Sequence, residues 1–239
     1  MKKYLPLSIA TILAVNVPNL TNAQLYVTAS VGGVPSVSGA TLETFDAPSP
    51  SILTLSGSAY LVTGWPYLFG GGAPINSAPP LCSGSTLAYF SEPSMSINGV
   101  NGFDGSQYVA VGASGSATLS LPGPENYLGI LWGSTASVDT LTFYDIANNV
   151  IGTVTAADVP GAPASGDPFH PTDTLYVNIT STTPFSRVVA TTGTDSFEFD
   201  DVAYALVVPE PASSVLFGCG LCLLGLRWQR KFTKSVNLE

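Results

Sequence analysis

The sequence predicts an all-β domain, a jelly-roll-like β-sandwich, between an N-terminal signal peptide and a C-terminal single transmembrane helix. Three observations favour this organisation. The chain has 24 glycines and 19 prolines, it has no long apolar stripe of helical period, and short apolar runs alternate with turn residues. Both ends depart from this pattern, because each combines an apolar run with basic residues. We therefore divide the chain into residues 1–23, 24–207 and 208–234.

The N-terminal segment has the parts of an export signal in their usual order. Lys2 and Lys3 form a short positive start, and residues 4–17 form an apolar run. Small residues then precede Gln24, as they do before a signal-peptidase cleavage site. The apolar run is short and contains proline and asparagine, which disfavours an uncleaved anchor. We expect signal peptidase to cleave after Ala23.

Ten short runs between these signals have the composition of β-strands, and Gly, Pro, Asn and Ser separate them. The pair Asn148-Asn149 tolerates positive φ, which predicts a hairpin. The expected strands are residues 40–45, 85–90, 107–112, 117–121, 127–133, 139–145, 149–156, 174–180, 185–192 and 196–208. Ten short strands without helices are typical of a two-sheet sandwich.

The last expected strand changes its apolar face. Phe197 and Phe199 stand at odd positions, whereas Val202 and Tyr204 stand at even ones. A strand with side chains of period two keeps one buried face through such a change only with a bulge. The sequence therefore predicts a β-bulge near Asp200, and a simple strand end is the alternative.

The C-terminal segment begins with a stiff tetrapeptide, Val208, Pro209, Glu210 and Pro211, and continues into an apolar run over residues 212–226. With Trp228 this run approaches the length of about 17 residues that a helix needs to cross a bilayer. The basic residues that follow predict a membrane stop with the body outside, and they are Arg227, Arg230 and Lys231. Cys219 and Cys222 lie within this span, as small apolar residues on one helix face.

This combination of parts resembles the PEP-CTERM sorting signal, a tail also named after an ice-binding protein. The resemblance covers residues 208–234 and implies recognition by an exosortase in a Gram-negative bacterium that makes exopolysaccharide. It also implies cleavage near the Pro-Glu-Pro, after an inner-membrane intermediate, with release or re-anchoring at the cell surface. The cysteines within the span and the residues beyond the basic cluster, 233–239, depart mildly from the usual pattern.

Two segments of the body resemble a family of exosortase-dependent surface proteins. They are residues 127–145, which contain a Tyr-x-Gly-x-x-Trp-Gly-Ser stretch, and residues 185–211, which contain a Phe-x-Phe-Asp-x-Val-Ala strand. The molecular activity of that family is not established. The resemblance therefore implies location and fold, and it implies no chemistry.

Charge is distributed unevenly along the chain. Six of the seven basic residues lie in the terminal segments, which leaves Arg187 alone in residues 24–208. Of the sixteen acidic residues only Glu210 and Glu239 lie outside that range, so the body holds fourteen acids and a formal charge of −13. Such a body is repelled by nucleic acid and by anionic membrane surfaces. Cations and neutral polar ligands suit it better.

The sequence offers little that would support catalysis. The body has one cysteine, Cys82, and the chain has one histidine, His170, which lies between two prolines. No Gly-x-Ser-x-Gly, His-Glu-x-x-His or phosphate-binding glycine motif occurs. Paired carboxylates would allow glycoside hydrolysis, and the available glutamates are Glu43, Glu92, Glu125 and Glu198. We expect no enzyme activity, with glycan hydrolysis as the third interpretation of function.

Calcium is the metal that the composition favours, because it takes about six to eight oxygen ligands. Asp104 lies in a Gly-rich loop, and Asp200 and Asp201 lie in the last strand. By analogy with jelly rolls that hold calcium where the first and last strands meet, Glu43 and Asp46 would join them. Solvated surface acids are the alternative. No other cofactor is expected.

A sugar-binding surface is the second interpretation of function. Trp65 and Tyr67 lie in a Gly-rich segment where exposed rings would stack on pyranose rings. An apolar plug beneath the loop is the alternative for the same residues. The sequence as a whole favours an exported, non-enzymatic protein with a structural or adhesive role in the exopolysaccharide or biofilm matrix. A carbohydrate-binding module of the cell surface is the runner-up.

Overall fold

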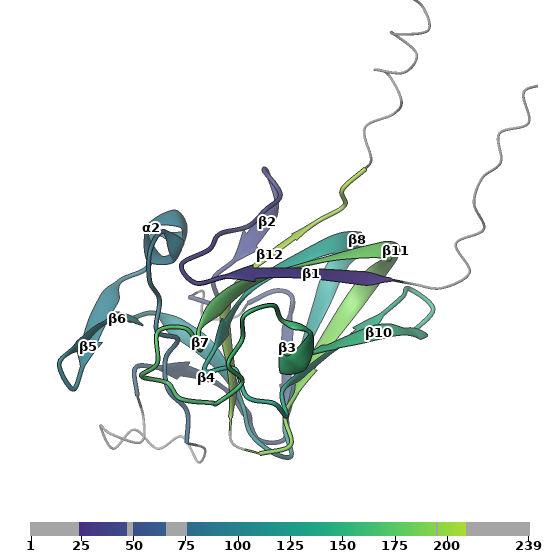
Figure 1. Cartoon of the computed structure of the whole chain (residues 1–239). Helices are drawn as coiled ribbons and strands as arrows, with labels where there is room; N and C mark the ends of the chain where they lie inside the picture. The colour runs from purple at the N-terminus through teal and green to yellow at the C-terminus, as the bar shows by residue number, and fades with distance from the viewer. Residues whose placement is uncertain (1–23, 47–49, 66–75, 195, 209–239) are drawn as a thin grey trace, which may run out of the picture.

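The computed structural model describes residues 24–46, 50–65, 76–194 and 196–208, and this part of the chain is an all-β protein (Figure 1). The expected all-β class is therefore confirmed. The strands are β1 (Leu25–Ser30), β2 (Thr41–Glu43), β3 (Leu53–Ser56), β4 (Ala59–Thr63), β5 (Ser94–Ile97), β6 (Val100–Asp104), β7 (Gln107–Val111), β8 (Ser116–Gly133), β9 (Thr140–Tyr144), β10 (Val150–Thr155), β11 (Leu175–Thr191) and β12 (Phe197–Ala205). Two short helical turns accompany them, α2 (Thr86–Phe90) and η1 (Ala156–Asp158).

The expected signal peptide and transmembrane segment lie outside the described residues, as does the sorting motif apart from Val208, which is exposed. Within the described ranges, no helix has both the length and the apolar character needed to cross a bilayer.

Ten strands form one large antiparallel sheet. Its main path runs β10-β9-β11-β8-β12-β7-β4, with β1 beside β11, β2 beside β12 and β3 beside β8. Strands β5 and β6 form a separate hairpin. The hairpin between β9 and β10 turns at Asn148, whose φ is 64°, as the Asn-Asn pair predicts.

The long strands β8 and β11 change neighbours along their length. The first part of β8 pairs with β3 and with the end of β11, whereas its second part pairs with β12 and with the start of β11. The register between β8 and β11 shifts on both sides of Phe185. The sheet is thus divided into two halves that share β8 and β11.

Both long strands correct a prediction. The expected strands ended before Pro122 and Pro124 and again before Pro184. The sequence therefore predicted four strands where the structure has two. Proline cannot donate a ladder hydrogen bond, and it is tolerated where pairing is already interrupted. The shifted register around Phe185 supplies that interruption, so each strand continues through its prolines.

One hydrophobic core lies between the two halves of the sheet. Leu128, Ile130 and Trp132 of β8 belong to the same buried cluster as Leu141 and Phe143 of β9. The Trp132 ring stacks on Phe197 with a centroid separation of 4.6 Å. The same faces of the two halves are therefore buried against each other, as in a two-layer arrangement.

Strand β12 is buried on both faces. Every side chain from Phe197 to Tyr204 is buried, including the acidic ones. Phe197 and Phe199 pack in the core, and the opposite face is covered by residues 76–106, here called the cover segment, which contains α2, β5 and β6. An acid-rich strand in this position carries its carboxylates into a protein interface.

The bulge in β12 is confirmed. Its pairing with β8 shifts between Asp200 and Ala203, and Asp201 adopts a left-handed φ of 51°. On the other edge, β7 pairs with residues 197–199 and β2 takes over at residues 202–204. The interpretation of a simple strand end is wrong.

Residues 85–90 were expected to be a strand, and this prediction is wrong because they contain α2. The helix buries Thr86 and Phe90, which a helix of period 3.6 places on one face. Phe90 and the partly buried Leu87 pack with Tyr176 and Leu131 of the sheet. A strand would direct Leu87 and Phe90 to opposite faces, and only one side of this segment meets the sheet.

Candidate functional site

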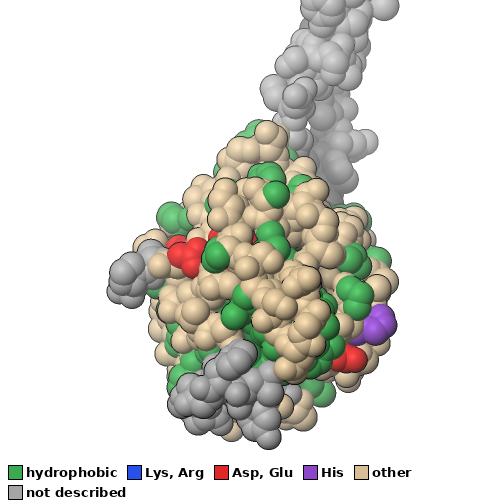
Figure 2. All heavy atoms as spheres, turned by 90° about the vertical axis from the view of Figure 1, so that its left-hand side faces the viewer, with side chains coloured by type: hydrophobic (Ala, Val, Ile, Leu, Met, Phe, Trp, Pro, Cys, Tyr) green, Lys and Arg blue, Asp and Glu red, His purple; other side chains and the backbone are tan. Residues whose placement is uncertain are grey.

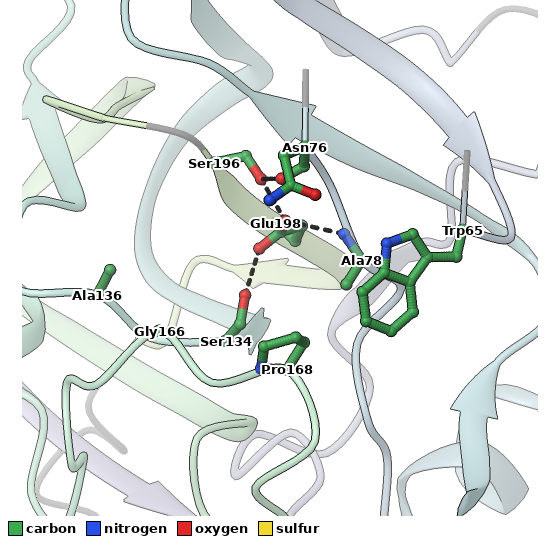
Figure 3. A pocket seen from close by; sticks show the side chains of 9 residues that line it. All are labelled: Trp65, Asn76, Ala78, Ser134, Ala136, Gly166, Pro168, Ser196 and Glu198. Atoms are coloured by element: carbon green, nitrogen blue, oxygen red, sulfur yellow. Dashed lines mark hydrogen bonds between the residues drawn. The ribbon is translucent and has the colours of Figure 1, made fainter. Parts of the chain in front are cut away.

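The Glu198 pocket is a cavity of about 90 Å³ at the start of β12 (Figure 3). Asn76 and Ser196 line it on one side of Glu198 and Ser134 on the other, and Trp65 is also among the lining residues. Pockets for small-molecule ligands measure about 300–1,000 Å³. The Glu198 pocket therefore accommodates a single small polar group, not a whole sugar ring.

Glu198 enters this pocket because it alternates with Phe197 and Phe199, which occupy the core face of β12. Its carboxyl group accepts hydrogen bonds from the hydroxyls of Ser134 and Ser196 and, at 3.1 Å, from the backbone N–H of Ala78. Burial raises the pKa of Glu198 to about 7, although these hydrogen bonds favour the ionised form. Both carboxyl oxygens are thus engaged in holding β8, β12 and the cover segment together.

A two-carboxylate hydrolase needs a second acid across a cleft. Asp139 acts on Glu198 through its charge, but its carboxylate accepts from the backbone N–H of Ala136 at 3.0 Å and from Trp132 Nε1 at 3.4 Å. Of the described residues that line the pocket, Glu198 alone is acidic, so the lining does not supply the second carboxylate.

Trp65 is buried, with 7% of its surface exposed. Its ring lies 5.0 Å from that of Phe169 and 6.1 Å from that of Phe103, centroid to centroid. The indole Nε1 has no hydrogen-bond partner among the described residues. Trp65 thus packs against Phe103 and Phe169 as a buried apolar side chain and does not present its ring face to solvent. Tyr67, its expected partner in sugar stacking, lies outside the described residues.

The structure brings Asp104, Asp200 and Asp201 together, as the calcium interpretation requires. Asp46 and Glu92 act on the same group through their charges. We call these five residues the acidic cluster. The set extends from the bulge of β12 to the end of β6, the residue after Phe45 and the turn after α2.

Local structure explains these positions. Asp104 is fixed by its backbone N–H, which donates to the Pro80 carbonyl at 2.9 Å, while its carboxylate accepts from Ser106 N at 2.8 Å. The bulge directs Asp200 and Asp201 out of the regular alternation. Asp46 accepts from the Gln107 backbone N–H at 3.1 Å.

Several oxygens of the acidic cluster have no partner. Asp104 Oδ2 and both carboxylate oxygens of Asp201 are buried without a hydrogen bond, and these two residues and Asp200 are 0% exposed. Burial raises the pKa of Asp201 to about 9 and of Glu92 to about 7, and it raises that of Asp200 well above its usual value. Neighbouring carboxylates raise all three further.

No basic side chain compensates this charge. Arg187 is the lone Lys or Arg of the described residues, and its guanidinium lies 3.6 Å from the ring centroid of Tyr144. The face shown in Figure 2 likewise displays no Lys or Arg side chain. As they stand, no three or more His, Cys, Asp or Glu side chains in the described part are placed so that they could hold a metal ion.

Sequence reasoning found part of the acidic cluster and missed the rest. It named Asp104, Asp200 and Asp201, and by analogy Asp46. Glu92 was considered only as an available glutamate, because nothing in its local sequence places α2 against the bulge. Glu43 does not join the cluster, and its Oε1 accepts from the Phe45 backbone N–H at 3.1 Å. Nothing in the sequence marked Ser134 or Ser196 as a hydrogen-bond partner of Glu198.

Comparison with known proteins gives little. No family model matches the chain, and no curated protein matches it. A solved structure from a study of glycan recognition in the cellulosome of Ruminococcus flavefaciens is similar at 12% identity, over 72% of this chain and 98% of that chain, with a TM-score of 0.32. A likeness at this level carries no argument about ligand or activity.

Proposed function

We propose that the protein is an exported, non-enzymatic surface protein of a Gram-negative bacterium. Signal peptidase removes residues 1–23, and an exosortase processes the tail at residues 208–211. The body, a β-sandwich of jelly-roll-like type, then serves a structural or adhesive role at the cell surface or in the exopolysaccharide matrix.

The observation that carries this proposal is where the body begins and ends. Gln24 and Thr182 are joined by two hydrogen bonds of 3.0 Å, and Val207 and Asn126 by two of 2.6 and 2.8 Å. Asn126 and Thr182 lie close together, because Tyr127 pairs with Thr180 in the β8–β11 ladder. Both ends of the body therefore leave it at the same end (Figure 1).

This geometry suits a body held between two processing signals. The central strand β12 ends at Ala205 and is closed by the Val207–Asn126 contacts before Pro209. Since Pro209 and Pro211 cannot donate ladder hydrogen bonds, they suit a stiff spacer to the membrane. The last strand thus ends before Pro209, and this supports the proposal that the tail acts as an address and is not part of the sheet.

The intact mass of the mature protein from its native cell tests this proposal. We expect a chain that starts at or near Gln24 and lacks residues 227–239. Changing Pro209, Glu210 and Pro211 together to alanine should retain the tail and trap the protein in the inner membrane. The control variant, Ser213→Ala with Ser214→Ala, should be processed normally. A surface protein of unchanged mass that keeps residues 227–239 would refute processing of the tail.

A carbohydrate-binding module is the second candidate, and the position of the Glu198 pocket favours it. Glu198 lies at the start of β12 and Val207 just beyond its end, and a strand of nine residues is about 30 Å long. The pocket thus lies at the end of the body far from the tail, where it would take a single hydroxyl of a matrix glycan. On a glycan array, binding that Glu198→Gln abolishes would support this candidate. If the array shows no binding, the structural or adhesive role would be the one remaining proposal.

A further inference from the structure

We propose that the acidic cluster binds one Ca²⁺ ion, which fastens the cover segment and the end of β2 to the bulge of β12. This inference goes beyond the proposed function, because it depends on neither the sorting tail nor a glycan. It concerns Asp46, Glu92, Asp104, Asp200 and Asp201.

The first argument is the set of unpartnered oxygens. Asp201 is 0% exposed, and neither of its carboxylate oxygens has a hydrogen-bond partner. Asp104 is equally buried, and its Oδ2 also lacks a partner. An uncompensated buried carboxylate is among the costliest groups that a protein interior holds. Three such oxygens, on residues brought together from two elements, point to a ligand that supplies positive charge.

The second argument is that the described chain offers no internal cation. Arg187 lies over Tyr144, in the half of the sheet formed by β9 and the end of β11. His170 is exposed and its Nδ1 contacts the Thr172 hydroxyl at 2.8 Å. The described chain therefore leaves two ways to neutralise the cluster, namely protonation of the carboxyls or a cation taken up from solution.

The third argument concerns the choice of metal. The cluster offers carboxylate oxygens, which are the ligands of hard cations, and no imidazole. The one neighbouring sulfur, of Cys82, donates to the Pro80 carbonyl at 3.8 Å and so stands as a thiol. Five carboxylates match the oxygen-rich, flexible shell of Ca²⁺ better than the small octahedral shell of Mg²⁺.

Binding requires a small rearrangement. The side chains of the described residues are not yet in coordination geometry, so the ion has to draw the carboxylates together. Asp46 is exposed and Glu92 follows α2, so these two side chains have room to move inward, whereas Asp104, Asp200 and Asp201 are already fixed by their backbones. The ion would thereby add a further link between three segments, the residue after Phe45, the cover segment and the bulge of β12.

Calcium titration of the full chain in detergent, after removal of divalent ions with EGTA, tests the proposal. We expect one ion bound per chain by calorimetry. We also expect the melting temperature to rise by about 5–10 °C at calcium one hundred times Kd, and by less with magnesium. Absence of both binding heat and a melting shift at about 10 mM calcium would overturn the proposal, since extracellular sites bind at about 0.1–1 mM.

Asp201→Asn separates a metal ligand from a structural carboxylate. It should weaken calcium binding roughly tenfold or more, because ligand charge sets the affinity of such sites. Without calcium it should melt at the same temperature as the wild type or higher, since it replaces a buried acid whose oxygens have no hydrogen-bond partner among the described residues. Asp145→Asn makes the same charge change in the β9–β10 turn and should keep full affinity. If Asp201→Asn keeps full affinity, Asp201 is not a ligand and the proposed site is wrong.

Asp46→Asn is the second variant, for the case in which Asp201→Asn does not fold. Asp46 is exposed, and an asparagine oxygen would still accept from the Gln107 N–H, so the fold should be kept. We expect weaker calcium binding by a similar factor. Unchanged affinity in this variant would remove β2 from the site and with it the proposed fastening.

Discussion

Asp139 shows how a buried carboxylate makes stability depend on pH. It is 0% exposed, and burial raises its pKa from about 3.8 to about 6. The folded state thus holds the proton more tightly than the unfolded state. As pH rises from about 4 to about 6, the unfolded chain ionises first, so the contribution of this group to stability falls. Above pH 6 the ionised carboxylate is fully destabilising.

Asp139→Asn should remove this dependence. Relative to the variant, the wild type should lose stability between pH 4 and pH 6 by roughly 3 kcal/mol, the free energy that corresponds to the raised pKa. Urea denaturation of both proteins across this range measures the difference. Asp145→Asn is a control of opposite sign, because hydrogen bonds from Asn149 lower the pKa of Asp145. Equal pH profiles for the wild type and Asp139→Asn would contradict the buried-acid interpretation.

At the residue scale, the sequence predicts chemistry better than it predicts contacts. The crowding of Asp200 and Asp201 in an apolar strand was visible, because acids seldom stand in such a run. The approach of Glu92 was not visible, since it depends on how α2 folds over the sheet. The burial of Trp65 depends in the same way on Phe103 and Phe169, which are distant in sequence.

At the element scale, two tyrosines limit the space on the outer face of β8. A Cβ on Gly129 would lie 2.6 Å from the hydroxyls of both Tyr127 and Tyr176. The Tyr176 hydroxyl donates to the Asp201 carbonyl at 3.0 Å, and the Tyr127 hydroxyl donates to Asn178 Oδ1 at 2.5 Å. Tyr127 therefore ties β8 to β11, Tyr176 ties β11 to β12 across β8, and the glycine leaves both rings room.

Gly129→Ala should therefore destabilise the protein by about 1–3 kcal/mol, as overpacking does. Gly123→Ala lies on the same strand, and a Cβ there would meet nothing within 4 Å. It should change the free energy of unfolding by less than about 0.5 kcal/mol. Chemical denaturation of the two variants side by side makes the comparison. Equal stability of the two would show that the tyrosines have other room to move.

Strand predictions succeeded where one face alternates and failed where prolines or short helices interrupt. The parity change in β12 predicted its bulge, because side chains of a strand alternate strictly. Pro122, Pro124 and Pro184 led to the division of two long strands, since a shifted register that tolerates proline leaves no mark in the sequence. Strand β1 lay in a segment without recognised pattern, and its place beside β11 is set by long-range pairing.

At the scale of the whole molecule, the body should fold without its tail. A chain truncated to residues 24–208 should be soluble and give β-type circular dichroism. Deletion of residues 197–204 should abolish folding, because it removes a central strand. Phe197 and Phe199 alone contribute roughly 1.5–3 kcal/mol each by burial, against a typical stability of about 5–15 kcal/mol. If the truncated chain aggregates while the full chain in detergent is folded, the apolar tail belongs to the core.

The position of Arg187 also determines where trypsin can cleave the body. Trypsin cleaves after lysine and arginine, and residues 24–208 contain this one such site. Its backbone lies within β11, paired with Ser120 on one side and Tyr144 on the other, so the folded body offers no accessible bond. Once unfolded, a chain of residues 24–208 would yield one long fragment, residues 24–187, and one short peptide, residues 188–208. If the protein is displayed as proposed, a trypsin-based survey of the cell surface would detect its body mainly through the single short peptide 188–208, and elastase or chymotrypsin would give many more peptides.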